Sequence, residues 1–206
     1  MGRLIVIVGG IGVGKTTLSR ALCNHGSFIT GLEEHNNRPF QMSFKTDSHF
    51  ALANQVDYLL YSAEQERLLR QSHQTGLMDG GLDLDFHGFT RLFHARSWLN
   101  DTEFDLCRRL YEFVRSSQPP PELVIHLTAA PEVIARRLAS RKRINIADLG
   151  DNTLIESNLQ DWLARLKPDQ VLSLDVSEDD PGFRRLLPSL LIALQSYTGM
   201  FESKNE

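Results

Sequence analysis

The sequence predicts an α/β protein in which helices cover both faces of one parallel sheet. Short apolar runs alternate along the chain with longer segments of helical periodicity, and this alternation is typical of a parallel sheet wrapped by helices. The apolar positions in each short run are consecutive, which suits strands buried on both faces. We therefore expect a three-layer sandwich around a five-stranded parallel sheet.

The order of the elements follows from these runs. The expected strands are residues 3–9 (RLIVIVG), 27–32 (SFITGL), 75–79 (TGLMD), 122–128 (ELVIHLT) and 170–175 (QVLSLD). The expected helices cover residues 15–25, 47–74, 86–117, 131–143, 152–166 and 181–197. The third helix is expected to break near Asn100 and Asp101, and the run SSQPPPE ends it because proline cannot continue a helix.

The composition narrows the class of protein. A length of 206 residues favours one domain spanning residues 1–206, and 41% apolar with 23% charged residues is ordinary for a globular protein. The net charge of −4 and the pI near 6.0 argue against a nucleic-acid or membrane-surface partner. No apolar run approaches the roughly 20 residues that span a bilayer. Two distant cysteines suggest neither a disulfide framework nor a zinc site, so we expect a cytoplasmic protein.

A phosphate-binding loop is the strongest motif. The stretch GGIGVGKTT, residues 9–17, fits G-x-x-x-x-G-K-[ST] and lies between an apolar strand and an amphipathic helix. A turn that merely caps a helix is the alternative, but both flanking elements favour nucleotide binding. The expected ATP-binding residues are Gly9, Gly10, Ile11, Gly12, Val13, Gly14, Lys15, Thr16 and Thr17. Lys15 would reach the β- and γ-phosphates, and the Thr16 hydroxyl would hold Mg²⁺.

The rest of the chain favours a small-molecule kinase. We find neither an N-K-x-D guanine-reading motif nor the apolar-D-E strand of a motor. Glu33 and Glu34 follow the second strand, where one of them would be a catalytic base or both would be solvated loop acids. Asp79 ends the third strand, and it is either a metal-holding acid facing Thr16 or a turn-capping residue.

Basic residues gather near the end of the helix that follows the fourth strand. Such a cluster in an acidic protein favours an arginine-rich lid over the γ-phosphate, although cations also favour helix C-termini for electrostatic reasons. The cluster comprises Arg136, Arg137, Arg141, Lys142 and Arg143.

These features, in this linear order, resemble the deoxynucleoside kinase family over most of the chain. Besides the loop, EEHNNRPF, FALANQ, DGGLDLDFHGF and ELVIHLTAAPEVIARRLASRKR resemble successive family motifs. The resemblance implies a P-loop kinase fold with a lid at about residues 137–150, ATP and Mg²⁺ as cofactors, and phosphorylation of a nucleoside 5′-hydroxyl. It implies a homodimer formed through the long middle helices. The mild preference for a purine deoxynucleoside rests on Asp85 and on similarity to bacterial deoxyadenosine and deoxyguanosine kinases.

The resemblance also implies roles for individual residues. Glu34 would be the base, and Asp79 would help to hold Mg²⁺, together with Thr16. Lys15 and the lid residues Arg137, Arg141 and Arg143 would neutralise the transferred phosphoryl group. The substrate-binding residues would be Glu34, Phe44, Gln55, Asp85 and Phe89, with Gln55 and Asp85 bonding to the nucleobase.

The match departs from the family on the acceptor side. Gly80 and Gly81 stand where the family has arginine and serine, Phe44 replaces a tyrosine, Ser62 replaces an arginine, and Ile146 falls near an expected lid acid. One hypothesis is an active kinase with a rebuilt pocket, for a nucleoside or another small hydroxyl compound, in which Arg91, Arg96 or His87 supplies the missing cation. The other is a catalytically weak or inactive nucleotide-binding module with a regulatory role.

Overall fold

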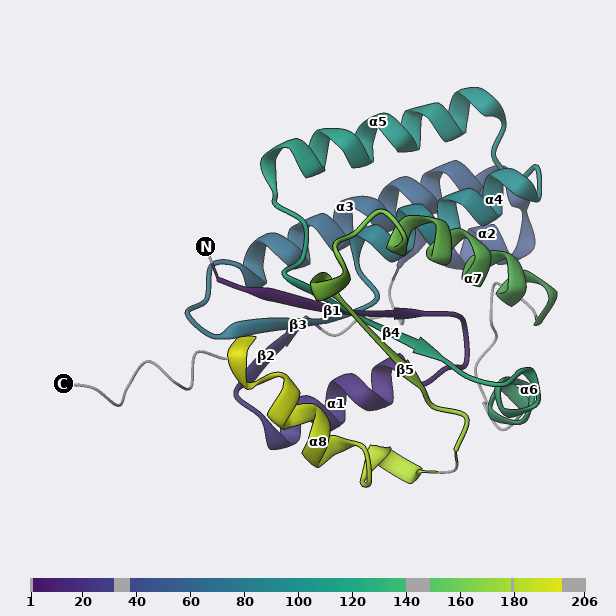
Figure 1. Ribbon diagram of the computed structural model, residues 1–206. Coiled ribbons are helices and arrows are strands. Elements are labelled where there is room, and N and C mark those ends of the chain that lie inside the picture. Colours follow the sequence, from purple (N-terminus) through teal and green to yellow (C-terminus); the bar gives the residue numbers. More distant parts are fainter. Residues whose placement is uncertain (1, 32–37, 140–148, 179, 198–206) are drawn as a thin grey trace.

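A five-stranded parallel sheet forms the middle layer of the protein (Figure 1). The computed structural model describes residues 2–31, 38–139, 149–178 and 180–197. The strands are β1 (Leu4–Gly9), β2 (Phe28–Gly31), β3 (Thr75–Asp79), β4 (Leu123–Thr128) and β5 (Val171–Asp175), in the order β2-β3-β1-β4-β5. All four ladders are parallel. The five predicted strands are therefore confirmed to within one residue at each end.

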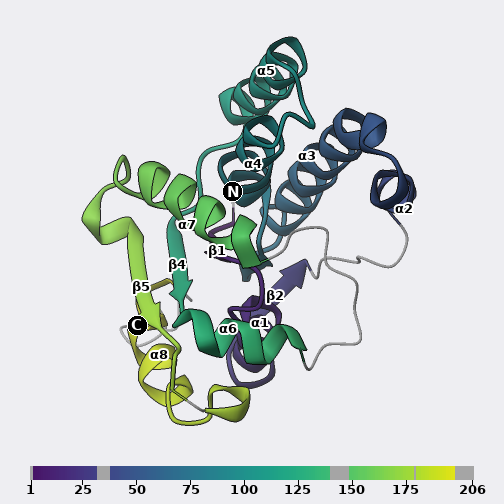
Figure 2. The same ribbon diagram turned by 90° about the vertical axis from the view of Figure 1, so that its right-hand side faces the viewer.

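Helices cover both faces of the sheet. Figure 1 shows α1 (Lys15–His25) and α8 (Leu187–Ala193) on one side, and α3 (Ala51–Leu69), α4 (Arg91–Ala95), α5 (Asp101–Ser117) and α7 (Leu149–Leu163) on the other. The helix α2 (Pro39–Thr46) packs beside α3, and α6 (Pro131–Ala139) follows β4 (Figure 2). Single 3₁₀ turns cover Ser48–Phe50, Pro168–Gln170, Pro181–Phe183 and Gln195–Tyr197, and a π-helical segment, η3, covers Leu84–Thr90.

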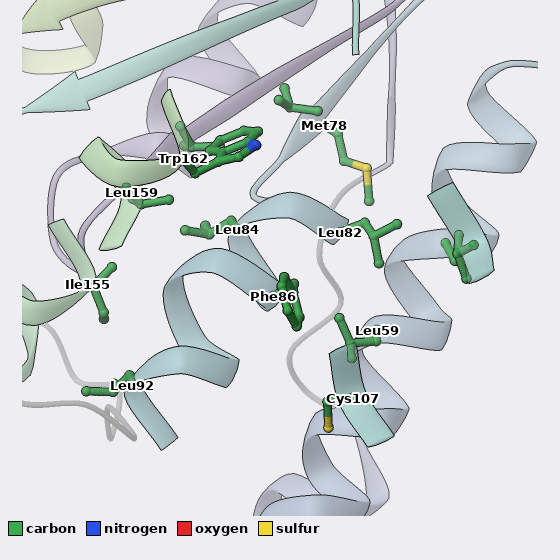
Figure 3. Close-up of a cluster of buried hydrophobic side chains, with 14 of the residues drawn as sticks. Leu59, Met78, Leu82, Leu84, Phe86, Leu92, Cys107, Ile155, Leu159 and Trp162 are labelled. Atoms are coloured by element: carbon green, nitrogen blue, oxygen red, sulfur yellow. The ribbon is translucent and has the colours of Figure 1, made fainter. Parts of the chain in front are cut away.

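The sheet separates two hydrophobic clusters. On β1, Leu4, Val6 and Val8 face the helices of the larger cluster, while Ile5 and Ile7 face α1 and α8. Because successive side chains of a strand point to opposite faces, a strand covered on both sides needs apolar residues at every position. Figure 3 shows the larger cluster, which joins β3, η3, α3, α4, α5 and α7 through Leu59, Met78, Leu82, Leu84, Phe86, Leu92, Cys107, Ile155, Leu159 and Trp162.

Several helix predictions need correction. Residues 39–46 form α2, which the sequence analysis did not assign, and Asp47 separates it from α3 by accepting a hydrogen bond from the backbone N–H of His49. α3 ends at Leu69 instead of residue 74, because a turn follows in which Ser72 Oγ accepts from the N–H of Gln74. The expected helix 181–197 is broken at Gly182, whose φ of 71° lies in the left-handed region.

Other boundaries are closer to the prediction. The expected helix 86–117 consists of η3, α4 and α5, and α5 begins where the break was expected, with Asn100 and Glu103 forming a capping box. α7 is displaced by three residues, covering Leu149–Leu163 instead of 152–166. Its first turn carries Asp151, which favours the helix N-terminus. Among the described helices, none is both long and apolar enough to cross a membrane.

Candidate active site

The phosphate-binding loop connects β1 to α1. Gly9, Gly12 and Gly14 have φ values of 140°, 77° and 111°, a backbone conformation that side chains other than glycine adopt only at a cost. The Lys15 amine donates hydrogen bonds to the carbonyl oxygens of Gly9 (3.0 Å) and Gly10 (2.8 Å). The lysine tip thus lies across the loop, while the N-terminus of α1 provides the amide groups that favour an anion.

Asp79 and Thr16 meet beside this loop. β3 pairs with β1 so that Asp79 is in register with Ile7, two residues before Gly9. The Thr16 hydroxyl donates a hydrogen bond to Oδ2 of Asp79, whose side chain is buried. The expected juxtaposition is therefore present. A hydroxyl and a carboxylate are oxygen ligands of the kind that Mg²⁺ prefers, so these two residues fit the Mg²⁺ that the resemblance implies.

The turn after β3 contains two glycines where the resemblance leads us to expect arginine and serine. Gly80 and Gly81 have φ values of 85° and 95°, and a Cβ at Gly80 would stand 3.4 Å from Cδ2 of Leu84. Space is therefore adequate at Gly80, but the backbone conformation favours glycine. The backbone at Gly80 and Gly81 thus favours glycine at the two positions where the resemblance leads us to expect arginine and serine.

His87 does not supply the missing cation. Its ring is buried, stacks on Trp162 with 5.2 Å between centroids, and places Nε2 3.1 Å from the Tyr111 hydroxyl. Burial lowers the pKa of His87 to about 4, with nearby arginines adding to the effect and Asp83 opposing it. A pKa this low and the burial of the ring argue against His87 as the replacement for the arginine charge.

The two arginine candidates lie on the α7 side of the site. Arg91 is 3.9 Å from a carboxylate oxygen of the exposed Asp161. Arg96 donates from Nε to Oδ1 of the buried Asp151 at 2.6 Å. Asp151 is in the first turn of α7 and precedes Asn152, which bonds to Ile11 of the phosphate loop. Arg96 is therefore paired next to a residue that contacts the loop, whereas Arg91 is paired near the other end of α7.

α7 contacts the phosphate loop directly, which the sequence analysis missed. Asn152 Oδ1 accepts a hydrogen bond from the backbone N–H of Ile11 at 2.7 Å. One turn further on, Glu156 Oε1 lies 2.7 Å from Nε2 of His126, a buried residue in register with Val8. Burial alone would raise the pKa of Glu156, but His126, with smaller effects of Gln160 and Lys15, holds that pKa below its usual value. The signal in the sequence that could have indicated these contacts was the spacing of Asn152 and Glu156, two polar residues four apart and so on the same side of a helix.

Part of the acceptor side is assembled by α3 and η3. Gln55 Nε2 donates to the backbone oxygen of Asp85 at 2.9 Å, and the Ser62 hydroxyl donates to Asp85 Oδ2. All three side chains are buried, and Thr90 Oγ1 also donates to the Asp85 backbone oxygen at 2.9 Å. The structure therefore brings Gln55 and Asp85 together, with Ser62 bonded to the carboxylate.

The two predicted aromatic substrate residues belong to the hydrophobic cluster. Phe44 is buried, with ring centroids 4.8 Å from Phe93 and 5.4 Å from Trp98. Phe89 is partly buried and packs against the same cluster. Both side chains thus pack within or against the hydrophobic cluster in this structure.

The predicted lid is described only at its start. Arg137 donates to the backbone oxygens of Val13 (2.9 Å) and Val176 (2.8 Å), which ties α6 to the phosphate loop and to the segment after β5. Glu34, Arg141, Arg143 and Ile146 lie outside the described residues, as does most of the lid predicted at about residues 137–150.

A buried charge network lies behind the Gly80–Gly81 turn and was also not predicted. Arg115 donates to Oε1 of Glu66 at 2.8 Å and to both oxygens of Asp83, at 3.1 and 2.7 Å. The Tyr111 hydroxyl donates to Asp83 as well, at 2.8 Å, and Arg70 contacts Glu66. These contacts join α3 and α5 to the turn that ends at η3.

The model of the deoxynucleoside kinase family matches residues 5–185 of the chain. This chain belongs to the deoxynucleoside kinase family. The expected family, the P-loop kinase fold and the assignment as a nucleoside kinase enzyme are thereby confirmed. The matched region includes the phosphate loop, Asp79 and the start of the lid.

Two curated members of the deoxynucleoside kinase family are similar to the chain. A deoxyadenosine/deoxycytidine kinase of Bacillus subtilis (strain 168) is 21% identical over 182 residues, which are 86% of this chain and 84% of that protein. A deoxyadenosine kinase of Dictyostelium discoideum is 30% identical over 145 residues, which are 69% of this chain but only 58% of the longer relative.

Solved structures support the fold. A deoxyadenosine kinase from M. mycoides superposes with a TM-score of 0.78 over 94% of this chain and 99% of the other, at 16% identity. It has been solved with dCMP and a flexible dCDP as products, and with dCTP. At this identity the similarity shows that the kinase fold is shared.

Proposed function

We propose that the chain transfers the γ-phosphoryl group of ATP to the 5′-hydroxyl of a deoxynucleoside, producing the 5′-monophosphate. The observation that carries this proposal is the contact between Thr16 and Asp79 beside a phosphate loop that Lys15 spans. Phosphoryl transfer requires positioning and charge neutralisation, and these residues supply both at one edge of the sheet.

Each part of the donor side has a role in this reaction. The loop amides and Lys15 hold the phosphates, and Thr16 and Asp79 hold Mg²⁺, which neutralises charge on the phosphates when bound. Glu34 takes the proton of the acceptor hydroxyl. The lid residues Arg137, Arg141 and Arg143 stabilise the phosphoryl group, and Arg96 is the candidate for the missing cation.

The acceptor is proposed to be a purine deoxynucleoside. The paired Gln55 and Asp85 provide a polar edge within an otherwise apolar wall, as nucleobase recognition requires. Phe44 and Phe89 supply the apolar part. The deoxyadenosine kinases among the relatives support a purine, while the deoxycytidine activity in one relative's name makes deoxycytidine the first competitor to test.

We also propose a homodimer formed through α3 and α5. These helices expose Leu60, Leu68, Leu106 and Phe113, and Phe113 is 74% exposed. Neighbouring apolar side chains on two adjacent helices favour association with a second copy. Sedimentation should show a dimer for the wild type and a monomer for Phe113→Glu, whereas a monomeric wild type would contradict this proposal.

Acceptor-dependent ADP release tests the reaction. The purified chain is incubated with Mg²⁺-ATP and each of a panel of nucleosides, with Lys15→Ala as the inactive control. Glu34→Gln should lower turnover by orders of magnitude and leave ATP affinity nearly unchanged, because a base acts in the transition state. An equal loss in Glu33→Gln would show that the other carboxylate is the base.

A nucleotide-binding module without transferase activity is the second candidate. It is favoured by the Gly80–Gly81 turn, which provides no cation where the family has one. In that case calorimetry would detect Mg²⁺-ATP binding that Lys15→Ala abolishes, but no nucleoside or other small hydroxyl compound would stimulate ADP release. Absence of nucleotide binding would contradict both candidates.

A further inference from the structure

Asn152 contacts the phosphate loop where the terminal phosphate of a nucleotide would lie. From the geometry we infer that Asn152 binds the γ-phosphate and makes the chain distinguish ATP from ADP. This inference rests on the proposed function, because it requires ATP to occupy the loop. It adds a ligand from α7, an element outside the motif itself.

The contacts of Lys15 indicate where the γ-phosphate would lie relative to Asn152. The amine of Lys15 donates to the carbonyls of Gly9 and Gly10, and in this type of loop the lysine reaches the β- and γ-phosphates. The Gly10–Ile11 corner therefore lies at the γ-phosphate end of the loop. Asn152 accepts the N–H of Ile11 at this same corner.

The chemistry follows from the orientation of the carboxamide. A backbone N–H can only donate, so the oxygen of Asn152 must face Ile11 and the NH₂ group is left as a donor. Nδ2 lies over Gly10, 2.9 Å from where a Cβ would stand. A neutral amide donor here can bond to a phosphate oxygen, and hydrogen bonds to charged groups are the stronger ones.

Gly10 provides an independent sign of this contact. Its φ is outside the left-handed region, so its backbone would accept a side chain. However, a Cβ would stand 2.1 Å from Asn152 Oδ1, and the three nearest atoms to that Cβ all belong to Asn152. The glycine at this free position of the motif therefore accommodates Asn152.

The rest of α7 holds Asn152 in place before any ligand binds. The preceding residue, Asp151, is paired with Arg96, and Glu156 is paired with His126 one turn later. These pairs hold this part of α7, and the bond from the Ile11 N–H holds the carboxamide itself, so Asn152 loses little conformational freedom when a phosphate binds. Its hydrogen bond to the nucleotide is thus preorganised.

Titration calorimetry with ADP and with a non-hydrolysable ATP analogue tests the inference. Asn152→Ala should weaken binding of the analogue by about ten- to a hundredfold and ADP binding by less than about threefold, since only the analogue carries a γ-phosphate. Asn152→Asp keeps the oxygen for Ile11 and adds a negative charge, so it should weaken binding of the analogue further. Thr153→Ala, an exposed neighbour on α7, should bind both nucleotides as the wild type does.

A double substitution tests the contact with Gly10. Gly10→Ala should weaken binding of the analogue, and adding Asn152→Ala should cause no further loss, because the collision is then removed. Gly12→Ala is the matched control: its φ of 77° makes it costly whatever stands at residue 152, so adding Asn152→Ala to it should cause a further loss of analogue binding.

Three results would overturn the inference. Equal losses for ADP and the analogue in Asn152→Ala would show that the residue only shapes the loop, and unchanged binding of both would show that it does neither. Failure of the wild type to bind either nucleotide would instead overturn the proposed function, and this inference with it. Thermal unfolding of each variant identifies those whose loss of nucleotide binding reflects misfolding. If Asn152→Ala is one of them, Asn152→Asp, which retains the Ile11 contact, decides the question by whether it weakens binding of the analogue more than binding of ADP.

Discussion

Replacing Arg115 with methionine should strongly destabilise the protein, because it leaves buried negative charge without its main partner. The Arg115 side chain is only 12% exposed, and it joins Glu66, which is inaccessible to solvent, to Asp83, which is 4% exposed. Burial alone would lower the pKa of Arg115, but the carboxylates of Asp83 and Glu66 raise it above its usual value. Methionine fills most of the volume of the arginine side chain, so the loss of unfolding free energy reports the missing charge and hydrogen bonds.

The magnitude follows from what each carboxylate retains. Glu66 keeps its contact with Arg70, whereas Asp83 keeps the hydroxyl of Tyr111. Removing one partner of a buried ion pair costs about 3–5 kcal/mol of unfolding free energy. For a domain of this size we expect Tm to fall by roughly 6–20 °C. Urea unfolding followed by circular dichroism measures the free energy, and calorimetry measures Tm.

A matched control and a rescue test the reasoning. Arg108 is on the same helix and pairs with Asp105 and Glu112 at the surface, so Arg108→Met should change stability little. Adding Asp83→Asn to Arg115→Met should recover part of the loss by removing the unpaired charge. If the double variant is no more stable than Arg115→Met, or if Arg108→Met is equally destabilising, the reasoning is refuted.

Three further predictions concern the site and its supports. The pKa of His87 falls from 6.5 to about 4 on folding, so between these pH values the unfolded chain binds more protons than the folded one. The free energy of unfolding should therefore fall by up to about 3 kcal/mol as the pH drops through this window. Urea titrations should show that the free energy of unfolding of His87→Gln depends less on pH than that of the wild type. Asp79→Asn should reduce turnover by orders of magnitude and raise the Mg²⁺ concentration needed for half-maximal rate; an unchanged Mg²⁺ dependence would remove Asp79 from the metal site. Gly80→Ala should cost about 1–2 kcal/mol in urea unfolding because of its positive φ, and Gly80→Arg should not increase turnover; a faster Gly80→Arg variant would show that the turn accepts the family arginine.

The sheet could be predicted from the sequence because burial on both faces leaves a local signature. The inner strands β1 and β4 carry mostly apolar residues that are buried on both faces, whereas the edge strand β5 has only intermediate and exposed residues and was located by its short apolar run. The start of α5 was equally visible, since Asn100 and Glu103 mark a capping box. In contrast, α2 is short and irregular in composition, and Gly182 interrupted a helix whose apolar pattern continued beyond it.

The part of the site that the main chain forms could be predicted most directly. The phosphate loop depends on glycines and backbone N–H groups, which a contiguous motif specifies. Asn152 is 141 residues from Ile11 and Arg115 is 49 from Glu66, so neither contact has a local pattern. Besides the four-residue spacing of Asn152 and Glu156 on α7, the second glycine of the loop was a local trace of Asn152, because nothing in the motif requires that glycine.

This difference also explains why the donor side matches the family while the acceptor side departs from it. The donor side tolerates little change, because each positive-φ glycine in the loop and the Thr16–Asp79 contact depend on fixed backbone positions. The predicted acceptor side consists of side chains from α3 and η3, and Ser62 of α3 bonds to Asp85 of η3 where the resemblance leads us to expect an arginine. Substitution there changes which molecule is recognised before it changes whether the nucleotide is held. The substrate of this chain should therefore be sought among nucleosides that differ at the edge facing Gln55 and Asp85.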